Sequence, residues 1–126
     1  MLKVVAGVFV IVGSLCTNFA AANEEACLLE GSVSMMGVSL EINDCLQNKG
    51  LAAAKFKEAC TSMSKMYVPM GGQPAKLTYL DSCPTPAQGI CENMAKQPLD
   101  SYHYSTDAGT LAGARASCSQ SGGSWQ

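Results

Sequence analysis

The single histidine of the chain is the first candidate for chemistry. His103 lies between Tyr102 and Tyr104 in a stretch that alternates like a strand, so the tyrosines share one face and the imidazole takes the other. A nucleophilic site would need a serine and an orienting acid to converge on this imidazole, and no motif such as G-x-S-x-G is present. If the tyrosines belong to the core, His103 is exposed; an exposed or structural histidine is favoured over a catalytic one, with a metal or pH-sensing role as the remaining alternative.

Methionines and carboxylates are the next candidates. Met63, Met66 and Met70 recur at spacings of three and four, which suits copper binding by thioethers but also marks any helix face. Pro69 would end a helix before Met70, which favours packing. The carboxylates are scattered, with no close pair of the kind that a glycosidase needs. We therefore predict no catalytic residue, no metal and no cofactor.

Aromatic side chains are the candidate binding residues. Tyr102, Tyr104 and Trp125 would anchor a partner if exposed and would close a small core if buried. Trp125 follows a Gly-Gly pair, which favours folding back over the last helix. The expected partner, if there is one, is a protein or a cell surface.

Cysteines form the framework that must position these side chains. After residue 22 the chain has six of them: Cys27, Cys45, Cys60, Cys83, Cys91 and Cys118. An even number in a short exported chain predicts three disulfides. A metal site is disfavoured, because there is no C-x-x-C pair and only one histidine. Six cysteines allow fifteen pairings, and spacing alone does not choose among them.

Similarity between two segments of the chain favours one of the fifteen possible cysteine pairings. Residues 54–64 align with residues 112–122, and each segment resembles a helix that ends at a cysteine, with a further cysteine upstream. If the two copies fold alike, the unmatched cysteines join them. The predicted pairs are Cys27 with Cys60, Cys91 with Cys118, and Cys45 with Cys83. The main rival is a local bridge from Cys83 to Cys91 across the intervening proline-containing loop.

Short strands and two helices are expected to carry this framework. Alternation predicts strands at 38–42, 76–80, 89–93 and 101–105. Helical spacing predicts a helix over 51–65 and a second one, capped by Ser105 or Thr106, that runs to Cys118. Residues 23–30 are expected to form a short helix or an extended lead-in, and Asn43-Asp44 a turn. The predicted class is α+β: a small disulfide-stabilised domain of two similar strand–helix units with short antiparallel strands.

An export signal is predicted for residues 1–22. Lys3 precedes an apolar run of roughly a dozen residues that ends on Ala20-Ala21-Ala22, and this run is shorter than the ~20 residues of a membrane span. Cleavage would leave 23–126 as a single cysteine-rich domain with two parts, 23–70 and 71–126, and no membrane span. The predicted location is secreted or periplasmic, where disulfides form.

Charge excludes one class of partner. The formal net charge is -2 and there is no basic run, so the chain lacks the electrostatic footprint of a nucleic-acid-binding protein. Without a catalytic constellation, the sequence favours a non-enzymatic binding or structural module. The alternative is a small exported enzyme or an inhibitor-like effector.

The C-terminal part resembles a known pattern. Cys-Pro at 83–84, Gly-Ile-Cys at 89–91, Tyr102-His103-Tyr104 and the run from Cys118 through Gly-Gly to Trp125 are similar to the order CP, GxC, YxY and CxxxGGxW of small exported bacterial cysteine-rich proteins. The first half departs from it, with residues 63–65 where a Gly-Gly is expected. The resemblance implies a bacterial exported protein and no particular activity.

Overall fold

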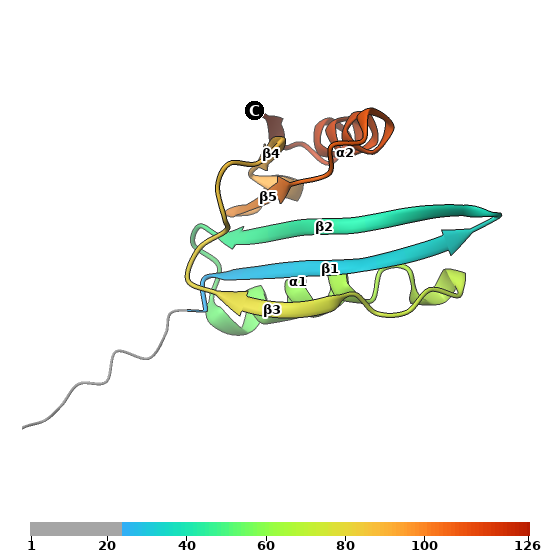
Figure 1. Ribbon diagram of the computed structural model, residues 1–126. Helices are drawn as coiled ribbons and strands as arrows, with labels where there is room; N and C mark the ends of the chain where they lie inside the picture. Colours follow the sequence, from blue (N-terminus) through green and yellow to red (C-terminus); the bar gives the residue numbers. More distant parts are fainter. Residues whose placement is uncertain (1–23) are drawn as a thin grey trace, which may run out of the picture.

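The computed structural model describes residues 24–126, so the predicted export signal lies outside the described residues. Six antiparallel strands form one sheet in the order β3-β1-β2-β5-β4-β6 (Figure 1). The strands are β1 (Ala26–Met35), β2 (Val38–Asn48), β3 (Lys76–Leu80), β4 (Gly89–Glu92), β5 (Leu99–His103) and β6 (Ser124–Trp125). The helices are α1 (Ala53–Ser64) and α2 (Ala108–Gln120), with short 3-10 turns η1 (Val68–Met70) and η2 (Met94–Lys96). The α+β class is confirmed.

The sheet consists of two units with the same topology. β1-β2-α1-β3 and β4-β5-α2-β6 each place their first strand in the centre, their second strand on one side and their third on the other. The units meet along β2 and β5, where Leu46 faces Ser101. Leu46 pairs with Cys27 on the central strand of the first unit, and Ser101 pairs with Cys91 on the central strand of the second. Leu46 and Ser101 therefore occupy equivalent positions in the two units. Since β3 pairs with β1, the first unit extends to Leu80, beyond the boundary expected at residue 70.

Both helices cover one face of the sheet. A single row of paired residues crosses all six strands on this face: Tyr79, Cys27, Leu46, Ser101, Cys91 and Trp125. α1 is tied to this row by the Cys27–Cys60 bond and α2 by the Cys91–Cys118 bond. The opposite face is covered by Cys83 and its loop, where Ala26 and Cys45 are buried against Tyr102 and Tyr104.

Three disulfides hold the fold, and their presence was expected from the number of cysteines. They join Cys27 to Cys60, Cys45 to Cys83 and Cys91 to Cys118. These are the pairs expected from the internal similarity, and the rival bridge from Cys83 to Cys91 is not formed. Each closed loop of this size stabilises a folded domain by roughly 2–4 kcal/mol.

Two local expectations were wrong, and a third is decided between its two alternatives. Residues 26–30 are extended rather than helical and form part of β1, because they pair with β2 on one side and with β3 on the other. Asn43 and Asp44 continue β2, and the turn occurs at Met36-Gly37, where both φ angles are positive, as a two-residue hairpin turn requires. The cap of α2 is Asp107, whose carboxylate accepts a 2.8 Å hydrogen bond from the Thr110 N–H.

Candidate functional site

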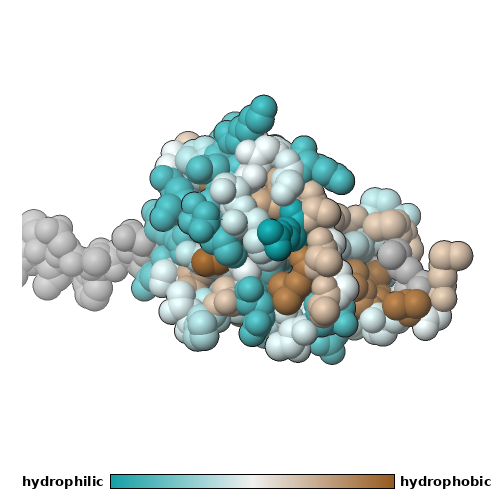
Figure 2. Space-filling view, turned by 90° about the horizontal axis from the view of Figure 1, so that it is seen from above, coloured by the Kyte–Doolittle hydropathy of each residue, from teal (hydrophilic) through white to brown (hydrophobic). Residues whose placement is uncertain are grey.

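A groove of about 720 Å³ lies on the helix-bearing face. Its floor comes from β2 and β5, and its walls come from α2 and from the residues at the end of α1. Apolar side chains supply most of the walls, among them Leu40, Ile42, Met63 and Leu111. Figure 2 shows apolar surface at the end of the molecule that holds the β1–β2 turn, while the other end is mainly hydrophilic.

The groove exists because the second unit has smaller side chains than the first. Phe56, four residues before Cys60, is 1% exposed and fills the core beneath α1 together with Leu46. The residue four positions before Cys118 is Ala114, which lines the groove, and the equivalent of Leu46 is Ser101. Two large apolar residues are thus replaced by an alanine and a serine, so α2 leaves a hollow where α1 covers a packed core.

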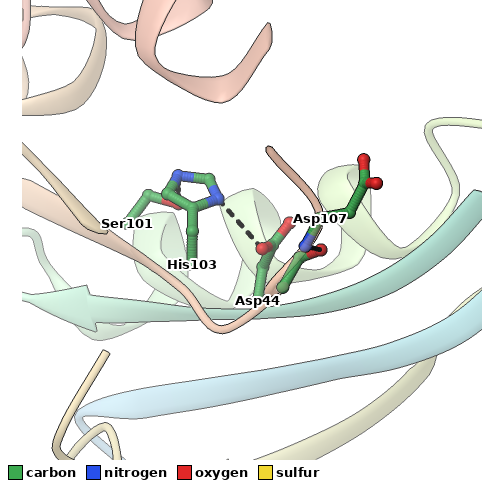
Figure 3. Close-up of polar contacts among 5 residues, drawn as sticks. Asp44, Ser101, His103 and Asp107 are labelled. Atoms are coloured by element: carbon green, nitrogen blue, oxygen red, sulfur yellow. Dashed lines mark hydrogen bonds and ion pairs between the residues drawn. The ribbon is translucent and has the colours of Figure 1, made fainter. Parts of the chain in front are cut away.

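A chain of hydrogen bonds lies in the floor of this groove (Figure 3). Asp44 Oδ1 lies 2.9 Å from His103 Nδ1, and His103 Nε2 lies 3.2 Å from Ser101 Oγ. Because a carboxylate only accepts hydrogen bonds, Nδ1 carries a proton, and in the neutral ring Nε2 then accepts the serine hydroxyl. Asp107 points away from this chain in Figure 3.

Strand pairing positions the three residues. Asp44 and His103 are direct partners across β2 and β5, and Ser101 lies two residues before His103 on the same face. The His103 side chain is only 16% exposed, and Ser101 is 1% exposed. Of the two favoured alternatives for His103, exposed or structural, the exposed one is wrong, because Trp125 stacks on the imidazole on the face opposite the tyrosines.

Trp125 closes one side of the histidine. Its ring stacks on the imidazole with centroids 5.4 Å apart. A β-carbon at Gly89 would overlap the indole, so only glycine leaves room for this stack. A β-carbon at Gly123 would lie 2.6 Å from Cys91 Sγ, so the second glycine of the Gly-Gly pair lets the chain pass close to the disulfide. These contacts give the glycines of the C-terminal pattern a physical role.

The predicted binding residues do not share a surface. Tyr102 and Tyr104 pack on the face opposite the groove, and the Tyr104 hydroxyl donates to the Pro84 carbonyl at 2.7 Å. Burial raises the pKa of Tyr104 to about 12, and the nearby Tyr102 and Asp44 add to this shift. Of the three aromatic residues, only Trp125 lies on the same face of the sheet as the groove, where it stacks on His103.

Sequence reasoning missed Asp44 and Ser101. Strand alternation was the available signal for Ser101, since it places residues 101 and 103 on one face. No local signal identified Asp44, which is 59 residues from its histidine partner and was expected in a turn.

The groove has an acidic character. Asp44 and Asp107 line it, and no lysine or arginine does. Glu41 also borders the groove, but it alternates with Leu40 and Ile42, so its carboxylate lies on the opposite face of β2. Hydrogen bonds from the Thr110 backbone and side chain lower the pKa of Asp107. A ligand with a positive charge and an apolar body matches both the walls and the charges.

The described residues hold no group of three or more histidine, cysteine, aspartate or glutamate side chains arranged to bind a metal ion. Of the three spaced methionines, Met63 packs against the core while Met66 and Met70 are 45% and 54% exposed. Over residues 24–126, neither helix is long and apolar enough to cross a membrane.

Comparisons with known protein families, with curated proteins and with solved structures gave no match for this chain.

Proposed function

We propose that this protein is a secreted or periplasmic binding protein that holds an amphipathic, positively charged ligand in the groove between α1 and α2. The observation that carries the proposal is the composition of this groove, with apolar walls, the carboxylates of Asp44 and Asp107 and no basic side chain. Burial of an apolar ligand body contributes roughly 25 cal/mol per Å² of surface removed from water. Asp44 and Asp107 would favour a cationic group over an anionic one by charge.

Two observations support the location. Three disulfides fit an oxidising compartment outside the cytoplasm. Residues 1–22 have the three-part composition of an export signal. The resemblance of the C-terminal part to exported bacterial proteins points in the same direction.

Isothermal titration calorimetry with two small amphiphiles of opposite charge tests the binding role. Below their micelle concentrations, decyltrimethylammonium should bind and decyl sulfate should bind at least about tenfold more weakly. Ala114→Phe should abolish binding, because it places in the groove the side chain that Phe56 provides under α1. The matched control is Ala116→Phe, on the exposed side of the same helix. If Ala114→Phe and Ala116→Phe bind decyltrimethylammonium equally well, the ligand does not occupy the groove.

A second candidate is an acyl hydrolase, which the Asp44–His103–Ser101 chain favours. The geometry of acid, imidazole and hydroxyl is that of a nucleophilic triad. Ser101 is 1% exposed, however, so its hydroxyl is poorly placed to reach a substrate, and this favours the binding protein. Hydrolysis of p-nitrophenyl acetate by the native protein, lost in both Ser101→Ala and His103→Ala, would instead establish the hydrolase.

A further inference from the structure

We infer that the groove takes an extended segment of another polypeptide, which adds a strand to the open edge of β2. This inference rests on the proposed function and names its ligand class. Recognition of this kind combines backbone hydrogen bonds at a sheet edge with side chains in adjacent pockets.

The β1–β2 hairpin extends beyond the rest of the sheet (Figure 1). β1 and β2 pair along 26–35 and 38–47, but β3 covers β1 only at 26–30 and β5 covers β2 only at 44–48. The outer half of the hairpin is therefore a two-stranded ribbon. Its β2 edge, residues 38–42, has no neighbouring strand among the described residues.

The hydrogen-bonding groups of this edge are identified by the alternation of the strand. The Tyr104 N–H donates to the Asn43 carbonyl on the β5 side, and the Asn48 N–H donates to the Glu25 carbonyl on the β1 side. In an antiparallel strand these directions alternate. Ser39 and Glu41 therefore direct their N–H and C=O groups toward the open side. Within residues 24–126 neither residue has a hydrogen bond outside the β1–β2 pairing.

This edge borders the groove. Leu40, Glu41 and Ile42 line it, and Leu40 and Ile42 lie on the helix-bearing face because they are four and two residues before Asp44 on the same strand. The chain leaves the line of β5 after Tyr104 and turns into α2, so among residues 24–126 no strand pairs with β2 on this side beyond Asn43. Every second side chain of an added strand would enter the groove between the two helices.

Charge and exposure define the chemistry of the segment. The apolar walls select apolar side chains on the groove face of the added strand, whereas the Glu41 carboxylate, on the opposite face of β2, selects basic side chains there. The apolar surface continues beyond the groove at Met36, Val38 and Met66, which are 103%, 66% and 45% exposed. Methionine adapts well to varied apolar partners. The segment should therefore alternate apolar and basic residues.

The same charges disfavour a second copy of this chain as the occupant. The free edge reads Val-Ser-Leu-Glu-Ile, with one acidic residue and no basic one. Pairing two such edges would bring like charges together across the new ladder.

The test uses a blocked heptapeptide, acetyl-(Val-Lys)₃-Val-amide, added to the full disulfide-bonded protein. Two further versions carry N-methyl groups on the odd or on the even residues, and a fourth replaces lysine by glutamate. We expect the heptapeptide to shift the NMR amide signals of Ser39 and Glu41. Because an added strand uses one edge only, one methylated version should still bind and the other should bind at least about tenfold more weakly, as should the glutamate peptide.

A pair of variants tests the edge from the side of the protein. Ser39→Pro removes an outward N–H without touching the groove side chains and should weaken peptide binding at least about tenfold, whereas Ser39→Ala should not. The thermal midpoint shows whether the proline variant is folded; if it is not, the two methylated peptides decide the outcome.

Three results would overturn the inference: no binding of the heptapeptide, equal binding of both methylated versions, or a dimer in sedimentation that the heptapeptide dissociates. If decyltrimethylammonium binds in a manner blocked by Ala114→Phe while the heptapeptide does not bind, the groove is a binding site but its ligand is not an added strand. If neither binds, the proposed function fails as well.

Discussion

Leu46 and Ser101 face each other across β2 and β5, at the point where the two units of the sheet are related by an approximate two-fold axis. Both are buried, with exposed fractions of 0% and 1%. Leu46 packs beneath α1, while Ser101 hydrogen-bonds to His103 in the floor of the groove. Equivalent positions thus serve the core in one unit and a polar site in the other.

Removal of the Cys91–Cys118 bridge should detach α2. Cys118 is the one buried residue of this helix, whereas α1 also buries Phe56. The double variant Cys91→Ala/Cys118→Ala should lose roughly 2–5 kcal/mol in urea unfolding. Hydrogen exchange should show lost protection at 108–120 and retained protection in α1. Uniform loss over both helices would contradict the separation of the two units.

Gly89→Ala should displace Trp125. The new methyl group would overlap the indole, so the ring must leave His103. The fluorescence of this single tryptophan should shift to longer wavelength, because the ring becomes more exposed to water. Gly113→Ala is the control, since a β-carbon there meets nothing within 4 Å. This control should leave the emission unchanged and raise stability by roughly 0.5–1 kcal/mol through helix propensity. An unshifted emission in Gly89→Ala would disprove the stack.

Tyr104 should make stability fall at high pH. Its pKa is raised from 10.0 to about 12, mainly by burial, so the unfolded chain releases this proton at lower pH than the folded protein does. The stabilising contribution is complete below pH 10 and is lost as the pH rises toward about 12. Urea unfolding over this range should show a steeper decline for the native protein than for Tyr104→Phe. If the free energy of unfolding falls equally with pH in the native protein and in Tyr104→Phe, burial does not raise the pKa of Tyr104.

Asp44→Ala should loosen His103. The variant removes the acceptor of the Nδ1–H bond and leaves a largely buried imidazole with one partner fewer. We expect a loss of roughly 1–3 kcal/mol, the range for a hydrogen bond to a charged group and for a donor left unpaired. Nitrogen NMR of the ring should show a mixture of tautomers in place of the single Nδ1–H form. Asn43→Ala, at the exposed neighbouring position, is the matched control.

Local patterns predicted the elements that are defined by local periodicity. The helical spacing of Phe56 and Cys60 identified α1, and alternation identified β3, β4 and β5. The helix-forming residues near Cys27 left helix and extended conformation both open, and pairing on both sides of β1 outweighs their intrinsic propensity. The Asp44–His103 hydrogen bond could not be predicted, since it depends on the register that brings together two strands 59 residues apart in sequence.

The order of the cysteines along the chain has a consequence for oxidation during synthesis. The segments closed by Cys27–Cys60 and Cys45–Cys83 overlap in sequence. All four of these cysteines are synthesised before Cys91. The last bridge involves only the last two cysteines. Oxidation in strict order of emergence would first join Cys27 to Cys45, so the two overlapping bridges need delayed oxidation or reshuffling, whereas the last bridge joins consecutive cysteines and needs neither.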